Sequence, residues 1–195
     1  MGSVGREQNR NGTNDDVTNF AQMVFDMWGS RDGNRSSDVQ DVYTDALRRQ
    51  IEAPEYQEVS NFLFEQGRGL GVAESLTKEQ ETMLNRIDRL AVPTIADITT
   101  YRTDSVAWLA NAHVGDRVPI KNILMSSTKQ NVVIPENVGQ VAQTMQIDMP
   151  MGTRVFAPSN GGERELDAVR GQSIEILSKS IDKKGVLHVK VRVVR

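Results

Sequence analysis

The sequence contains no cysteine and only two histidines among its 195 residues. Disulfides, zinc–thiolate sites and cysteine nucleophiles are therefore excluded. Two histidines also leave few residues from which a histidine metal site or a Ser-His-Asp triad could be built. We expect His188 to lie on a strand surface and His113 in a loop, and we assign neither of them a chemical role. The lack of cysteine also fits a cytoplasmic protein, and we expect that location here.

Long apolar runs and a strong charge of one sign are missing as well. No run approaches the roughly 20 apolar residues that span a bilayer, so we expect no membrane partner. The polar N-terminal segment has no apolar core of the kind a secretory signal needs. With 23 basic and 26 acidic residues, the formal net charge is −3. Global electrostatics therefore give no argument for nucleic-acid binding, while a local basic patch stays open.

The two common phosphate-binding glycine motifs are also absent. No G-x-G-x-x-G follows a predicted strand, and the sequence has no P-loop. The glycine-rich stretch Gly67–Gly71 follows a predicted helix. We interpret it as a turn at the end of that helix, and a phosphate-cradling role is the alternative.

The first half of the chain has the periodicity of helices. The polar residues 1–15 predict a disordered tail. Apolar residues then recur at helical spacing and predict four helices, at about 16–28, 37–53, 58–66 and 77–91. A capping box of Thr77 and Gln80 opens the last helix. One apolar stripe follows it, made of Met83, Leu84, Ile87 and Leu90.

The second half is rich in strands. β-Branched and aromatic residues predict strands at 97–102, 120–127, 146–156 (in two pieces around a Pro-Met-Gly turn) and 163–170. Alternating runs around an Asp-Lys-Lys-Gly turn predict a hairpin at 173–194. Short helices are predicted at 105–112, capped by Asp104, and at 135–145. Helices followed by antiparallel strands predict an α+β fold, with a helical N-terminal region (16–96) and a strand-rich core (97–195) in one compact domain.

Three polar features of the core are candidates for chemistry. Arg102 ends a predicted strand and offers five fixed N–H donors suited to a phosphate. Ser126–Thr128 ends an apolar strand with three hydroxyls that can orient a carboxylate. Glu163 and Glu165 are two residues apart, so they point to the same face of a strand. Taken singly, the three features are more typical of a surface ion pair, an ST-turn and a solvated strand edge than of a functional site.

The order of the three features resembles the Arg–Ser–Glu class of mono-ADP-ribosyltransferases. The middle motif of that family is Ser-Thr-Ser, here Ser126–Thr128, and an apolar-Pro-x-Gly turn then leads through a strand to the glutamates. The similarity covers residues 97–195 and implies a mixed, mainly antiparallel two-sheet core that binds NAD. The sequence departs from the family at Thr103, where glycine is common, and at Asp167, where an apolar residue is usual.

The resemblance implies that NAD is the substrate, that no metal is needed, and that nicotinamide leaves through an oxocarbenium-like transition state. Glu165 would stabilise the positive charge that develops on the ribose, beside the 2′-hydroxyl. Ser126 would orient Glu165, and Arg102 would hold an NAD phosphate. The rest of the implied NAD-binding set is Ser127, Thr128 and Phe156.

The resemblance assigns the choice of acceptor to Glu163. Family members with glutamate at this position mostly modify arginine, and a carboxylate can pair with a guanidinium at two points and act as a general base. We therefore expect target proteins with an acceptor arginine, and a nucleic-acid acceptor stays open. The expected setting is host modification by a tailed phage, or alternatively a toxin-type catalytic domain. The alternative function is a catalytically inactive structural or interaction protein, such as a virion component, on the same fold.

Overall fold

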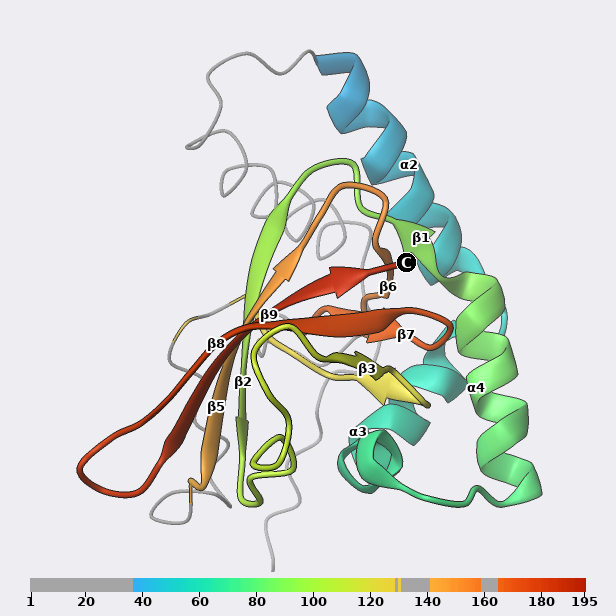
Figure 1. Cartoon of the computed structure of the whole chain (residues 1–195). Helices are drawn as coiled ribbons and strands as arrows, with labels where there is room; N and C mark the ends of the chain where they lie inside the picture. Colours follow the sequence, from blue (N-terminus) through green and yellow to red (C-terminus); the bar gives the residue numbers. More distant parts are fainter. Residues whose placement is uncertain (1–36, 129, 131–140, 159–164) are drawn as a thin grey trace, which may run out of the picture.

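The computed structural model describes residues 37–128, 130, 141–158 and 165–195 (Figure 1). The predicted tail, the first predicted helix and Glu163 lie outside the described residues. The described part contains three helices followed by nine strands in two sheets, which confirms the predicted α+β class. None of its helices is long and apolar enough to cross a membrane.

The three helices α2 (Ser37–Glu52), α3 (Tyr56–Val72) and α4 (Lys78–Leu90) lie together on one side of the molecule (Figure 1). The predicted limits of α2 and α4 are confirmed to within one residue. The capping box is confirmed too, because Thr77 Oγ1 accepts the Gln80 N–H (3.2 Å) and Gln80 Oε1 accepts the Thr77 N–H (2.9 Å). The buried stripe of α4 contains Met83, Leu84 and Ile87.

The glycine-rich stretch lies inside α3, so its prediction as a turn after the helix was wrong. A Cβ atom at Gly67 would lie 2.7 Å from Met125 Sδ, and one at Gly71 would lie 3.0 Å from the Ile123 carbonyl oxygen. These two glycines therefore let α3 approach strand β4 (Ile123–Leu124) closely. The stretch is helical backbone, without the loop leading into a helix N-terminus that a phosphate-cradling motif needs.

Alanine in place of Gly69 should raise the free energy of unfolding by about 0.5–1 kcal/mol, because alanine is the better helix former. Nothing lies within 4 Å of the added Cβ at Gly69. The same exchange at Gly71 should lose this gain, because its Cβ would lie 3.0 Å from the Ile123 carbonyl oxygen, a backbone atom that cannot rotate away. Urea unfolding of the two variants measures the difference, and equal stability would contradict close packing as the reason for Gly71.

The nine strands form two sheets (Figure 1). The five-stranded sheet has the order β2-β5-β9-β8-β3, in which β5 and β9 are parallel and the other pairs antiparallel. The four-stranded sheet has the order β1-β6-β7-β4 and is antiparallel throughout. The bounds not yet given are β1 (Val92–Pro93), β2 (Ile98–Asp104), β3 (Arg117–Pro119), β5 (Gln143–Met149), β6 (Arg154–Phe156), β7 (Asp167–Val169), β8 (Ser173–Ile181) and β9 (Leu187–Val194).

Two of the predicted turns are confirmed. The hairpin of β8 and β9 turns at Gly185, whose φ of 81° is in the left-handed region that glycine tolerates. The Pro-Met-Gly turn ends at Gly152, with a φ of 88°. Because β5 and β6 belong to different sheets, this second turn carries the chain from one sheet to the other.

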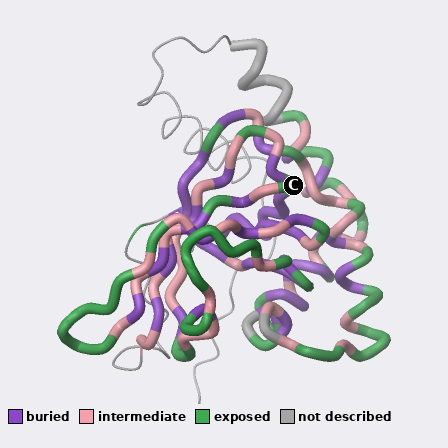
Figure 2. The backbone as a smooth tube through the Cα atoms, in the orientation of Figure 1, coloured by how far each residue is buried: buried purple, intermediate pink, exposed green. Residues whose placement is uncertain are grey.

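The four-stranded sheet is buried on both faces. Its side chains alternate between two apolar clusters, as the strand period of two requires. The cluster shared with the five-stranded sheet includes Leu124, Val155 and Ala168. The cluster shared with α3 and α4 includes Ile123, Phe156 and Val169. Figure 2 shows this buried centre and the exposed tip of the β8–β9 hairpin.

The helix predicted at 105–112 was wrong, because these residues form consecutive turns. The N–H of Leu109 donates to Gln143 Oε1 at 3.0 Å, which takes this group out of a helical pattern. Lys179 Nζ donates to three carbonyl oxygens of the same segment, from Leu109, Ala110 and Ala112. Side chains from the neighbouring strands thus hold the segment as turns.

Two other segments differ from their predictions. Residues 120–127 do not form one strand, because only Ile123–Leu124 pairs as a strand there and Ser127 makes isolated bridges further on. Gln143–Met145, predicted as the end of a helix, instead begin β5. The rest of that predicted helix falls mainly outside the described residues.

Candidate active site

Three segments that are far apart in the sequence meet at Ser127. Its N–H and carbonyl form two backbone hydrogen bonds of 2.8 Å with Tyr101, and an antiparallel bridge joins it to Glu165. Tyr101 belongs to β2 of the five-stranded sheet, and Glu165 comes just before β7 of the four-stranded sheet. The serine segment therefore joins the two sheets and brings the neighbourhoods of Arg102, Ser126 and Glu165 together.

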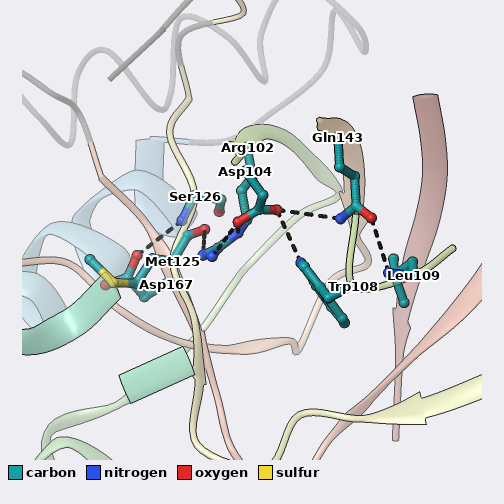
Figure 3. A network of polar contacts seen from close by, with 8 residues as sticks. All are labelled: Arg102, Asp104, Trp108, Leu109, Met125, Ser126, Gln143 and Asp167. Carbon is teal, nitrogen blue, oxygen red and sulfur yellow. Dashed lines mark hydrogen bonds and ion pairs between the residues drawn. The ribbon is translucent and has the colours of Figure 1, made fainter. Parts of the chain in front are cut away.

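The Arg102 guanidinium is held from two sides (Figure 3). Its Nε and Nη2 donate to Oδ1 of Asp104 at 2.8 and 2.6 Å, and its Nη1 donates to the Met125 carbonyl at 3.0 Å. These contacts with described residues use three of the five N–H groups of the guanidinium. The other two N–H groups can bind a further acceptor, and the side chain is 12% exposed.

Asp104 was not among the predicted site residues, yet it is the centre of this network (Figure 3). While Oδ1 binds Arg102, Oδ2 accepts from Trp108 Nε1 at 3.1 Å and from Gln143 Nε2 at 3.3 Å. A nearly buried charge pair is stable only when such extra hydrogen bonds satisfy it. The Arg-x-Asp spacing at the end of a strand, which puts both side chains on one face, is the signal that sequence reasoning missed.

Ser126 binds the backbone that follows Glu165. The Ser126 hydroxyl donates to the Leu166 carbonyl at 2.6 Å and lies 2.9 Å from Thr100 Oγ1. The Ser126 carbonyl accepts the Leu166 N–H at 2.8 Å. One serine therefore holds both backbone polar groups of Leu166, which fixes the direction in which the side chain of the preceding residue leaves the backbone.

Next to this backbone lies the Asp167 carboxyl. It is completely buried on β7, where Asp167 pairs with Phe156, and its Oδ1 accepts the Ser126 N–H at 3.2 Å (Figure 3). Burial raises the pKa of Asp167 well above its usual range, and the nearby Glu165 carboxyl adds to this. The Ser126 N–H and the Arg102 charge act in the opposite direction without reversing the shift of this pKa.

The remaining predicted site residues occupy different environments. Ser127 and Thr128 are nearly buried beside the meeting point of the two sheets. Phe156, which the resemblance assigned to NAD binding, is completely buried in the cluster that faces the helices. It therefore belongs to the core of this structure and presents no surface to a ligand. Glu163 lies outside the described residues.

No protein-family model matches the sequence, and no curated protein matches it. Solved structures do match. C3larvin toxin, an ADP-ribosyltransferase from Paenibacillus larvae, has a TM-score of 0.57 at 12% identity, over 73% of this chain and 97% of that chain. An ADP-ribosyltransferase from Clostridium botulinum has a TM-score of 0.54 at 10% identity, over 96% of this chain and 98% of that one. C3stau2 from S. aureus, solved with NAD, has a TM-score of 0.53 at 10% identity, over 92% and 94%.

These neighbours share little sequence with the chain, so the likeness is one of fold. It extends over nearly the whole length of each neighbour and, for two of them, of this chain. It agrees with the α+β arrangement of two mostly antiparallel sheets beside a group of helices. The chain therefore has the fold of bacterial ADP-ribosyltransferases, as the sequence resemblance predicted.

Proposed function

We propose that this protein transfers ADP-ribose from NAD to arginine side chains of target proteins. One observation carries the proposal: Ser127 pairs with Tyr101 on one side and Glu165 on the other. This pairing gathers the arginine, serine and glutamate motifs at one junction, in a fold that solved ADP-ribosyltransferases share. Three signals that were weak along the sequence support a common site once they meet in space.

The reaction exchanges one bond at the C1′ atom of the nicotinamide ribose. The bond from C1′ to nicotinamide breaks, and its electron pair leaves with nicotinamide. A nitrogen of the acceptor guanidinium forms the new bond to C1′ and loses a proton to a carboxylate base. Positive charge develops on the ribose during this exchange, and the Glu165 carboxylate stabilises it.

The neighbouring residues hold the substrate and the glutamate in this proposal. Arg102 binds an NAD phosphate through the N–H groups that its contacts with Asp104 and Met125 leave over. Asp104 keeps the guanidinium in a fixed plane, so less side-chain entropy is lost when the phosphate binds. Ser126 sets the direction of Glu165 through its two hydrogen bonds to Leu166.

The proposal that arginine is the acceptor depends on Glu163, which lies two residues before Glu165 in the sequence. A second carboxylate at this position pairs with the guanidinium of the acceptor and takes the proton that it loses. Arginine is thereby favoured over acceptors that carry no positive charge. When water replaces the acceptor, the same site hydrolyses NAD, and Glu163 is not needed for that side reaction.

Radiolabelled NAD tests the activity and the division of roles in one experiment. The wild type should release nicotinamide and label both a small guanidine compound and proteins of a bacterial lysate. Glu163→Ala should lose the transfer of label but retain much of the NAD hydrolysis. The control is Glu65→Ala, a change at an exposed glutamate of α3 that should leave both activities unchanged.

Each part of the proposal has its own contradictory outcome. If the wild type releases no nicotinamide and transfers no label, the chain is not this enzyme and the inactive interaction protein becomes the better hypothesis. If Glu163→Ala loses hydrolysis and transfer equally, the assignment of acceptor recognition to Glu163 is wrong. If the label appears on nucleic acid and not on protein, the acceptor is nucleic acid and the assignment to arginine is wrong.

A further inference from the structure

A buried acid that the proposed reaction leaves unused lies two residues after Glu165. Asp167 is completely buried, and its neighbours on the same face of the four-stranded sheet are Phe156 across the strand pair and Val169 along the strand. Both neighbours belong to the apolar cluster that packs against the helices. An ionised carboxylate in such surroundings is costly unless charges and hydrogen bonds compensate it.

The compensation around Asp167 is incomplete. Its Oδ1 accepts one hydrogen bond, from the Ser126 N–H at 3.2 Å. Its Oδ2 is buried, and no hydrogen-bond donor among the described residues reaches it. The charged groups that face Asp167 are the Glu165 carboxyl, from its own strand segment, and Arg102, from β2. Arg102 donates to Asp104 and Met125 but not to Asp167, so it acts on Asp167 only through its charge.

We propose that Asp167 is a positioning residue for Glu165, which keeps its proton at neutral pH and donates it in a hydrogen bond to the Glu165 carboxylate. This inference rests on the proposed function, because it concerns the glutamate to which that function assigns the chemistry. It deepens the site by adding a third acid, Asp167, which is completely buried and therefore does not contact NAD.

The placement of the two acids decides which of them carries the charge. Asp167 is fully buried, whereas Glu165 is 9% exposed at the junction of the sheets. Two adjacent carboxyls share one negative charge over a wide pH range, and the less buried acid is the better place for it. The raised pKa of Asp167 agrees with this order. Protonation also turns Oδ2 from an acceptor without a donor into a donor, with Glu165 as its acceptor.

With the proposed hydrogen bond from Asp167, Glu165 is held at its carboxylate as well as at its backbone. Ser126 already holds Leu166 at the carbonyl and the N–H, and its own N–H holds the Asp167 carboxyl. The backbone of Glu165 is thus fixed from one side and its carboxylate from the other. A carboxylate whose direction is set before the substrate arrives needs no reorganisation when charge develops on the ribose.

Two variants of Asp167 distinguish the effect of its hydrogen bond to Glu165 from the effect of simply filling the buried space. Asp167→Asn keeps an N–H donor for Glu165 and an oxygen for the Ser126 N–H, but it cannot ionise. Asp167→Leu has a similar size and neither group. We expect Asp167→Asn to keep kcat for nicotinamide release close to the wild type. We expect Asp167→Leu to lose about 10- to 100-fold in kcat, the effect of one hydrogen bond to a charged group, with KM for NAD unchanged.

The pH profile gives a readout that a purely structural role would not move. In the wild type, kcat should fall at alkaline pH as Asp167 loses its proton and repels Glu165. In Asp167→Asn this alkaline limb should be absent, because the amide has no proton to lose in that range. The same limb in both proteins would overturn the inference.

Two further measurements do not depend on catalysis. Carbon NMR of protein labelled at the aspartate carboxyl carbon should show one signal, absent in Asp167→Asn, that titrates far above the usual aspartate range. The raised pKa also means that the native state holds this proton more tightly than the unfolded state. The stabilisation that this proton gives is therefore fully present at pH values below the unfolded-state pKa of about 4. It is lost as the pH rises through the folded-state pKa of Asp167. The melting temperature of Asp167→Asn relative to the wild type should thus increase with pH across that window.

The outcomes of the two proposals can be told apart. An aspartate signal that titrates in the usual range, or Asp167→Asn and Asp167→Leu with equal kcat, overturns the role of Asp167 even when the enzyme is active. A wild type that releases no nicotinamide overturns the proposed function, and the NMR titration then still decides whether Asp167 holds its proton.

Discussion

Glutamine in place of Glu165 should lower both nicotinamide release and label transfer by about 10²–10³-fold, the usual effect of removing one group that stabilises transition-state charge. Glutamine has nearly the same shape but no charge, so the ribose loses the anion that offsets its positive charge. The bridge to Ser127 involves only the backbone at position 165 and should persist. Steady-state rates of nicotinamide release at saturating NAD measure the effect.

The control for this prediction is Glu65→Gln, the same chemical change at an exposed position of α3. Its rates should equal those of the wild type. The KM for NAD should change little in Glu165→Gln, because the glutamate is expected to act on the transition state more than on bound NAD. Rates within a few-fold of the wild type, in a protein with unchanged melting temperature, would remove Glu165 from the reacting centre.

Asparagine in place of Asp104 should cost about 3–5 kcal/mol of unfolding free energy, because the Arg102 charge would remain nearly buried without its counter-charge. For a chain of this length, the melting temperature should fall on the order of 10 °C. Thermal unfolding followed by circular dichroism measures the loss. The KM for NAD should also rise, since the guanidinium is no longer held in one plane for the phosphate.

An exposed ion pair provides the matched control. Asp45 accepts from Arg48 at 3.2 Å on the surface of α2, with side chains 63% and 45% exposed. Asp45→Asn should cost no more than about 0.5 kcal/mol, because water screens both charges. If the two asparagine variants are equally stable, the network around Asp104 does not anchor the end of β2.

Local signals in the sequence were enough to place several elements. The capping box of Thr77 and Gln80 set the start of α4, and the alternation around Gly185 set the β8–β9 hairpin. In each case the deciding groups lie within one turn or one strand pair. The same is true of Pro54, which follows the end of α2.

Elements that depend on distant side chains were not predictable in this way. Asp104 looked like a helix cap, but it remains in β2 and accepts from Gln143, 39 residues further along. The glycines of α3 looked like a turn because the strand that needs their small size comes more than 50 residues later. Such contacts appear in the sequence only as isolated residues.

The candidate site shows both cases. The order of Arg102, Ser126 and Glu165 led to the right fold, and the structure brings their segments together through Ser127. Phe156 could not be recognised as a core residue from the sequence. The residue pattern of a strand is the same whether this position is half-buried beside a ligand or fully buried, as it is here. Asp167 stood out only as a departure from the family pattern. The acceptor and the biological setting stay predictions.

One peptide group links the two halves of the site. The Met125 carbonyl, which accepts from Arg102, and the Ser126 N–H, which donates to Asp167, belong to the same amide. Because a peptide group is planar and resists rotation about its C–N bond, this carbonyl and this N–H move together as one rigid unit. If Arg102 binds a phosphate as proposed, any tilt of this plane that follows Arg102 also moves the Ser126 N–H. In the proposed site, phosphate binding at Arg102 and the proton affinity of Asp167 are therefore coupled through the orientation of one amide plane.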